Sequence, residues 1–136
     1  MKEKILEALE ELGFQLKHVE DVGYEFSYEG TTYLYLQNEK DEAFCSIAIP
    51  GICRMDEDNI EDLKLMYSVN ANRKYVKAYK LSHSLWLFYE RDMATEGDFK
   101  EAIYNMIQHL DATYRQLGKS DEDDDDEVME EMDDED

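Results

Sequence analysis

Residues 23–49 read GYEFSYEGTTYLYLQNEKDEAFCSIAI, and this stretch predicts three consecutive strands joined by two turns. Before Gly30, aromatic residues alternate with Glu25 and Ser27, and beyond it apolar residues alternate with tyrosines. A period of two residues is typical of strands that turn one face toward a core. Residues 43–49, AFCSIAI, are apolar on both faces, which predicts a strand in the interior of the sheet.

The turn at Gly30 decides which side chains of the first two strands share a face, because one extra loop residue turns a whole strand over. A two-residue loop groups Tyr33 and Tyr35 with Phe26. A three-residue loop, with Gly30 in a bulge, groups Leu34 with Phe26 instead. We expect the three-residue loop, because it buries the leucine and leaves Tyr33 and Tyr35 on a polar face.

Helical patterns lie on both sides of these strands, and a second hairpin follows. The expected helices are 2–12, 58–73 and 95–118, and the second hairpin pairs 75–81 with 85–91. Residues 16–22 fit either a loop or an extra edge strand, and we expect a connection. The order α-βββ-α-ββ-α predicts an α+β fold with three helices and an antiparallel sheet of about five strands. The core residues expected from these stripes are Phe26, Leu34, Ile47, Ile103 and Leu110.

Charge divides the chain into residues 1–119, a single domain, and residues 120–136, an acidic tail. The tail holds 13 of the 35 acidic residues and no base, so the domain carries a net charge of -8 out of a total of -21. Like charges and few apolar residues predict a disordered tail. Nucleic acid is an unfavourable ligand for this acidic surface, in which we recognise no basic stripe.

No catalytic or metal-binding set is recognisable. The histidines, His18, His83 and His109, are expected in a connection, a turn and the last helix, without ligand spacing. Cys45 lies in an apolar strand, where a thiol is inert, and Cys53 follows a turn. The glycines are isolated, so there is no phosphate-binding loop. We predict no enzymatic activity, no cofactor and no metal site.

The two cysteines and the charged residues 1–13 also indicate where the chain resides. Residues 1–13, MKEKILEALEELG, carry too many charges for a hydrophobic targeting segment, which predicts a reduced, cytoplasmic protein. No apolar run approaches the roughly 20 residues that cross a bilayer. We therefore expect no membrane-spanning segment.

The middle helix has two apolar sides. Its main stripe, which we expect to face the sheet, consists of Ile60, Leu63, Tyr67 and Ala71. Leu65 and Val69 lie on a nearly opposite side, so they face either a second subunit or a strand edge.

Aromatic residues are abundant, with ten tyrosines, five phenylalanines and one tryptophan. Aromatic side chains on a sheet surface are typical of protein-binding patches, although helices or a second subunit would also cover them. Together with the second side of the middle helix, they give the predicted partner-binding residues Tyr33, Tyr35, Leu65, Val69 and Trp86.

The element order, together with GYEFSYEGTTYLYL and SLWLFYE, resembles the type III secretion chaperone fold and the related bacterial sensory transduction regulator family. The resemblance covers residues 1–119 and is one of topology. It implies a homodimer, with the middle helix and the neighbouring strand surface at the interface. It also implies that the protein binds a partner polypeptide and performs no chemistry.

Two hypotheses for function follow. The first is a non-catalytic protein-binding module, chaperone-like or regulatory, whose partner is a polypeptide of unknown identity. The second is an acidic-tail effector, in which residues 120–136 engage a basic protein partner and the domain is a dimerising platform. The tail would equally serve only to solubilise the protein. Removal of the tail separates the two hypotheses, because only the second loses its partner.

Overall fold

The computed structural model describes residues 2–37 and 43–126, with side chains described as far as residue 117. Within these ranges the chain forms three helices and a six-stranded antiparallel sheet, which confirms the expected α+β class and element order. The elements are α1 (Lys2–Glu11), β1 (Lys17–Val19), β2 (Gly23–Tyr28), β3 (Thr31–Leu36), β4 (Phe44–Ile49), α2 (Ile60–Asn72), β5 (Val76–Leu81), β6 (Ser84–Asp92) and α3 (Phe99–Asp126).

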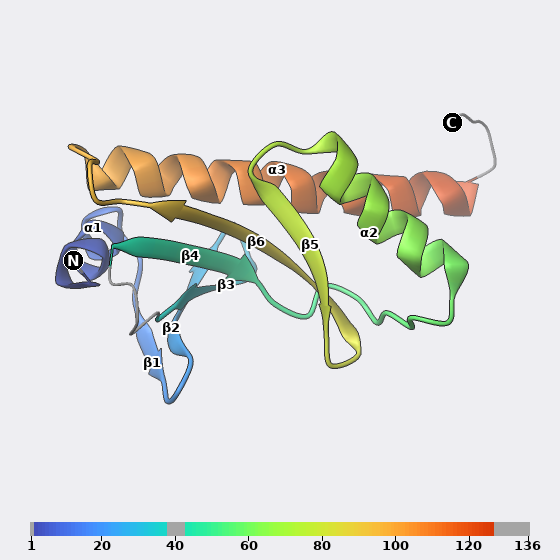
Figure 1. The fold of residues 1–136 in the computed structure, drawn as a ribbon, viewed down its shortest axis with the longest axis horizontal. Coiled ribbons are helices and arrows are strands. Elements are labelled where there is room, and N and C mark those ends of the chain that lie inside the picture. The colour runs from blue at the N-terminus through green and yellow to red at the C-terminus, as the bar shows by residue number, and fades with distance from the viewer. Residues whose placement is uncertain (1, 38–42, 127–136) are drawn as a thin grey trace.

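The sheet has one strand more than expected. Residues 17–19, expected to be a connection, form the short edge strand β1 and pair with β2. The strand order is β1-β2-β3-β4-β6-β5, so β4 lies in the interior, as its two apolar faces predict, and β5 forms the second edge. Figure 1 shows α3 running along the length of the sheet, with α1 near one end of the sheet and α2 beside β5.

One continuous core lies between the sheet and the helices. It contains buried residues of all three helices and of five of the six strands. Four of the expected core residues, Phe26, Ile47, Ile103 and Leu110, belong to it. Leu34 is also buried, but it lies outside this cluster.

The expected three-residue loop between β2 and β3 is wrong, and the two-residue alternative is right. Phe26 pairs with Tyr33 in the sheet, so the loop consists of Glu29 and Gly30 alone. Both residues have positive φ, 52° and 79°, as a type I′ turn requires. The aromatic rings of Phe26 and Tyr33 stack with centroids 5.5 Å apart. This aromatic packing buries tyrosines on the face that we had assigned to Leu34.

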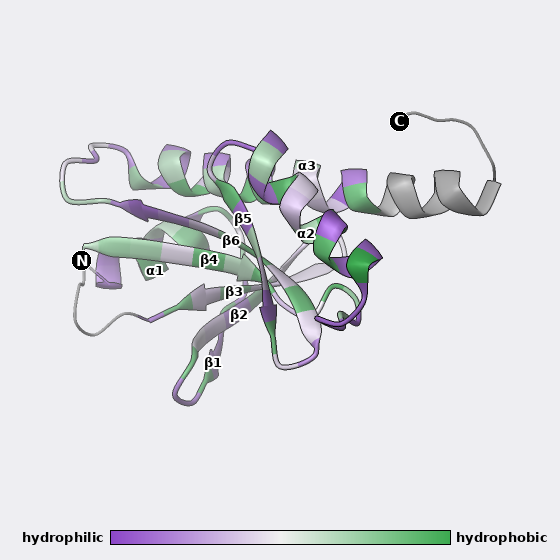
Figure 2. Cartoon of the chain, turned by 45° about the vertical axis from the view of Figure 1, so that its right-hand side comes forward, coloured by the Kyte–Doolittle hydropathy of each residue, from purple (hydrophilic) through white to green (hydrophobic). Residues whose placement is uncertain are grey.

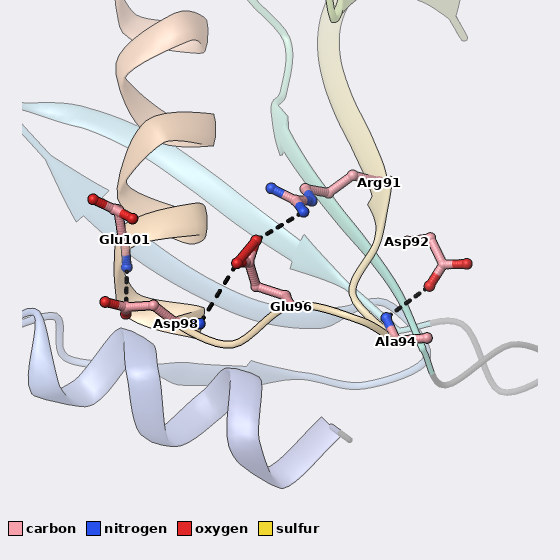
Figure 3. A network of polar contacts seen from close by, with 6 residues as sticks. All are labelled: Arg91, Asp92, Ala94, Glu96, Asp98 and Glu101. Carbon is pink, nitrogen blue, oxygen red and sulfur yellow. Dashed lines mark hydrogen bonds and ion pairs between the residues drawn. The ribbon is translucent and has the colours of Figure 1, made fainter.

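Side-chain caps begin the second and third helices. Asn59 caps α2 by accepting hydrogen bonds from the backbone N–H groups of Glu61 and Asp62, so the helix begins at Ile60 and not at the expected position 58. At α3, the Asp98 carboxylate accepts from the backbone N–H of Glu101 at 3.1 Å (Figure 3). Such caps satisfy backbone donors that have no partner within the helix.

An ion pair holds the turn between β6 and α3. Arg91 at the end of β6 contacts Glu96 at 2.9 Å, and the Glu96 carboxylate accepts from the backbone N–H of Asp98 at 3.5 Å (Figure 3). Since Asp98 in turn caps α3, this turn links the interior of the sheet to the start of the last helix.

We expected helix α3 to end at Gly118, but it continues to Asp126. Glycine inside a helix costs only about 1 kcal/mol relative to alanine, so an established helix continues through it. The first residues of the segment that we expected to lack structure, 120–126, are therefore helical. The rest of the expected disordered tail, residues 127–136, lies outside the described part of the chain.

Candidate functional site

The described residues contain no group of three or more metal-ligating side chains. Two of the three histidine rings pack against tyrosines: the ring of His18 lies 5.1 Å from that of Tyr24, and the ring of His109 lies 5.2 Å from that of Tyr75. Cys45 is fully buried, and this burial raises the pKa of its thiol to about 12. The thiol is therefore protonated at neutral pH and is a poor nucleophile.

Two of the predicted partner-binding residues are core residues. Tyr33 and Tyr35 have relative exposures of 0% and 3%, because the two-residue loop turns them toward the helices. Burial, more than the nearby charge of Asp111, raises the pKa of the Tyr33 phenol. Its hydroxyl has no hydrogen-bond partner among the described residues. The prediction that these tyrosines form a surface patch is wrong.

The two sides of α2 are reversed relative to the prediction. Leu65 and Val69 pack against the core, and Val69 is only 5% exposed. The stripe that we expected to face the sheet is instead exposed, with Ile60 at 65%, Leu63 at 39% and Tyr67 at 74%. We call Ile60, Leu63, Tyr67 and Ala71 the outer stripe of α2.

The contact of α2 with the sheet edge explains this reversal. The Asn70 side chain donates to the backbone oxygen of Ala78 at 3.0 Å and accepts from its N–H at 2.7 Å. The Asn70 side chain thus makes the pair of hydrogen bonds with the edge of β5 that a residue of a neighbouring strand would make. The helix therefore lies beside the sheet edge and packs Leu65 and Val69 inward, where they face α3 across a small pocket. Its outer stripe is left exposed at Ile60, Leu63 and Tyr67.

Exposed hydrophobic residues concentrate around α2 and β5. Seven large apolar side chains are exposed in the described part of the chain, and six of them lie within residues 60–81. Tyr79 and Leu81 of β5 belong to this group, with exposures of 49% and 43%. Large apolar residues gathered on one surface are typical of interaction sites, whereas scattered ones are normal.

The face of the sheet opposite the core also carries apolar side chains. Six apolar residues of β3, β4 and β6 lie on it, outside the core cluster. Three of them are half-buried, Leu36, Phe44 and Trp86, and three are buried, Leu34, Ala48 and Phe88. Trp86 is half-buried, and its ring stacks on Phe88 with centroids 5.9 Å apart. The ring centroid of Tyr79, which pairs with Trp86 in the sheet, lies 5.5 Å from that of Phe88. We call this surface the open face, and of the predicted partner-binding residues only Trp86 belongs to it.

Figure 2 colours the chain by hydropathy. Strand β4, which contributes to both faces of the sheet, is largely hydrophobic, whereas hydrophobic and hydrophilic segments alternate along α2.

Charges of opposite sign flank α2. Residues 56–62, DEDNIED, contain five acids and no base, whereas residues 73–80, RKYVKAYK, contain four bases and no acid. The acidic segment begins the helix and the basic one follows its end, so each favours the helix dipole. We had recognised no basic stripe, although the sequence of residues 73–80 alone contains this signal. We call residues 73–80 the basic strip.

None of the helices in the described ranges combines the length and apolar character that crossing a membrane requires. No protein-family model matches this chain, and a search of curated proteins finds no match.

Proposed function

We propose that this protein is a non-catalytic, homodimeric module that binds another polypeptide. The observation that carries the proposal is the gathering of exposed hydrophobic residues on α2 and β5, next to an open sheet face that is also apolar. The proposal agrees with the resemblance to type III secretion chaperones and bacterial sensory transduction regulators, which rests on topology. Fold alone does not define a function, so the proposal depends on these surfaces.

The outer stripe of α2 fits a second copy of the same chain. In a twofold dimer, each surface must complement itself. When two α2 helices pack antiparallel, the acidic segment 56–62 of one copy meets the basic strip of the other, and this happens twice. The stripe between these ends is apolar, with Leu63 and Tyr67 near its middle. Charge complementarity and the apolar stripe therefore favour the same antiparallel arrangement.

The open face fits the partner polypeptide. Trp86, Phe88 and Tyr79 present adjacent aromatic rings at one end of this face, and Leu36 and Phe44 lie on strands further along it. Aromatic residues are enriched in the centres of protein interfaces, because they bury large areas at low entropic cost. The partner we propose is a segment that presents apolar side chains to this face.

Sedimentation equilibrium at micromolar concentration tests the dimer. We expect the unmodified protein to sediment as twice its chain mass of 16.1 kDa. Leu63→Glu with Tyr67→Glu places two carboxylates in the contact without compensating charges. This change should cost at least about 3 kcal/mol of association free energy, which weakens the dimer more than about 100-fold.

Tyr104→Glu is the matched control. Tyr104 is also an exposed tyrosine on a helix, at 44%, but it lies on α3 outside the proposed contact. This variant should remain a dimer. A monomeric unmodified protein, or equal weakening by both changes, would contradict an interface on α2.

A further inference from the structure

We propose that the acidic residues 127–136 of this chain bind its own basic strip, as an internal ligand for the edge of the sheet. The proposal concerns a contact within one chain, and it does not require the partner binding proposed above. Three observations carry it: the charge and exposure of the strip, the reach of the chain beyond α3, and the composition of residues 127–136.

The basic strip is exceptional in this molecule. It holds four of the 14 basic residues within eight positions, although the chain as a whole carries a net charge of -21. Lys74 and Lys77 are exposed and Lys80 is half-buried, and no ion pair is recorded for them in the described part of the chain. Most of the strip belongs to the edge strand β5, which packs beside α2, and there Asn70 binds the backbone of Ala78. Exposed bases on a sheet edge can therefore accept an acidic segment.

The geometry of α3 brings the tail within reach of this strip. The Arg73 guanidinium donates to the side-chain oxygen of Gln116, so the strip begins where α3 passes α2. From Gln116 to Asp126 the helix advances about 15 Å. Lys77 lies about 13 Å along the chain from Arg73. The ten residues that follow Asp126 span up to about 33 Å when extended. This length exceeds the path of about 28 Å that leads from Asp126 back past Gln116 and Arg73 to Lys77.

The composition of residues 127–136, EVMEEMDDED, complements the surface that they would meet. Seven of the ten residues are acidic, opposite four bases in the strip. Val128, Met129 and Met132 are apolar, and the exposed Tyr79 and Leu81 lie on the same strand as Lys77 and Lys80. Methionine adapts readily to irregular aromatic surfaces. The same contact would place a negative segment beside α2, where it competes with the acidic segment of a second subunit.

A spin label attached at position 132 tests the contact. The label is introduced by Met132→Cys in a Cys53→Ala background of the full chain, and amide signals are compared before and after its reduction. We expect the label to broaden the amides of residues 74–81 selectively. Broadening should be strong at an ionic strength of about 0.01 M and lost at about 1 M, because the Debye length falls from about 30 Å to about 3 Å.

Two sets of substitutions locate the charges that matter. Replacement of Lys74, Lys77 and Lys80 by Gln should abolish the broadening. Replacement of Lys2, Lys4 and Lys17 by Gln should leave it unchanged, because those lysines lie on α1 and β1, away from α2 (Figure 1). If either set of substitutions disturbs the fold, the dependence of the broadening on ionic strength, measured without lysine substitutions, still tests whether the tail binds the strip through charges.

Some outcomes would overturn the proposal. Broadening spread evenly over the surface, or absent from residues 74–81, would show that the tail does not bind the strip. A mixture of spin-labelled chains with isotope-enriched chains that carry no spin label tests for contacts between molecules. If the spin label broadens only the signals of the isotope-enriched chains in this mixture, the tail binds the strip of another molecule. The sedimentation of the dimer is a separate measurement, so failure of one proposal is distinguishable from failure of the other.

Discussion

Gly23→Ala is expected to lower the free energy of unfolding by about 3 kcal/mol or more, through backbone strain and a steric clash. Gly23 has a φ of 153°, which side-chain-bearing residues rarely adopt. A Cβ atom at this position would lie 1.9 Å from the backbone oxygen of Tyr35 on the paired strand β3. Relief of this clash requires β2 and β3 to separate, because the opposing atom belongs to the backbone. Chemical denaturation measures the change.

Gly97→Ala is the matched control for this prediction. No atom lies within 4 Å of a Cβ built at Gly97, and its φ is outside the region that only glycine favours. The control should change stability by less than about 0.5 kcal/mol. If Gly23→Ala were equally neutral, the close approach of β2 to β3 at this position would be incorrect.

Leu110→Ala is expected to cost about 2 to 5 kcal/mol, because the lost side chain leaves a cavity in a packed core. Leu110 is fully buried on α3 within the cluster that joins the helices to the sheet. The same denaturation experiment on Asn105→Ala supplies the comparison. Asn105 is exposed on the same helix, so its replacement by a better helix former should be neutral or slightly stabilising. A loss below about half a kcal/mol at Leu110 would show that α3 packs elsewhere.

The sequence predicted the order of elements because each period and cap is a local signal. Alternation around Phe26, the helical stripe containing Leu110 and the glycine after α1 each depend on a few neighbouring residues. The register of β2 and β3 depended on one loop residue, and there the argument failed. Ranking leucine above tyrosine as a core residue favoured the wrong loop, because it ignored the stacking of Phe26 on Tyr33.

The orientation of α2 was not determined by its own sequence. A helix with two apolar stripes can bury either stripe in the core, and the elements that pack against the helix decide which one is buried. Here Asn70 binds the edge of β5 at Ala78, and this contact turns Leu65 and Val69 toward the core. The contact joins a side chain to a backbone eight residues away, and no periodic pattern reveals it. The predicted interface residues on α2 were therefore on the wrong side, although the prediction of two apolar sides was right.

Disulfide cross-linking of paired cysteine variants tests the α2 dimer most directly. Ile60→Cys and Ala71→Cys are prepared separately in a Cys53→Ala background, mixed and oxidised. In an antiparallel contact centred on the outer stripe, position 60 of one chain faces position 71 of the other. Two copies of position 71 would lie about 16 Å apart along the helix axis, beyond the Cα separation of about 7 Å that a disulfide spans.

The account predicts that the mixture forms the cross-linked dimer between the two variants, while each variant alone forms little. Cys45 is fully buried and should not contribute. Efficient cross-linking of either variant with itself would indicate a parallel contact, and no cross-linking in the mixture would contradict a dimer through the outer stripe of α2.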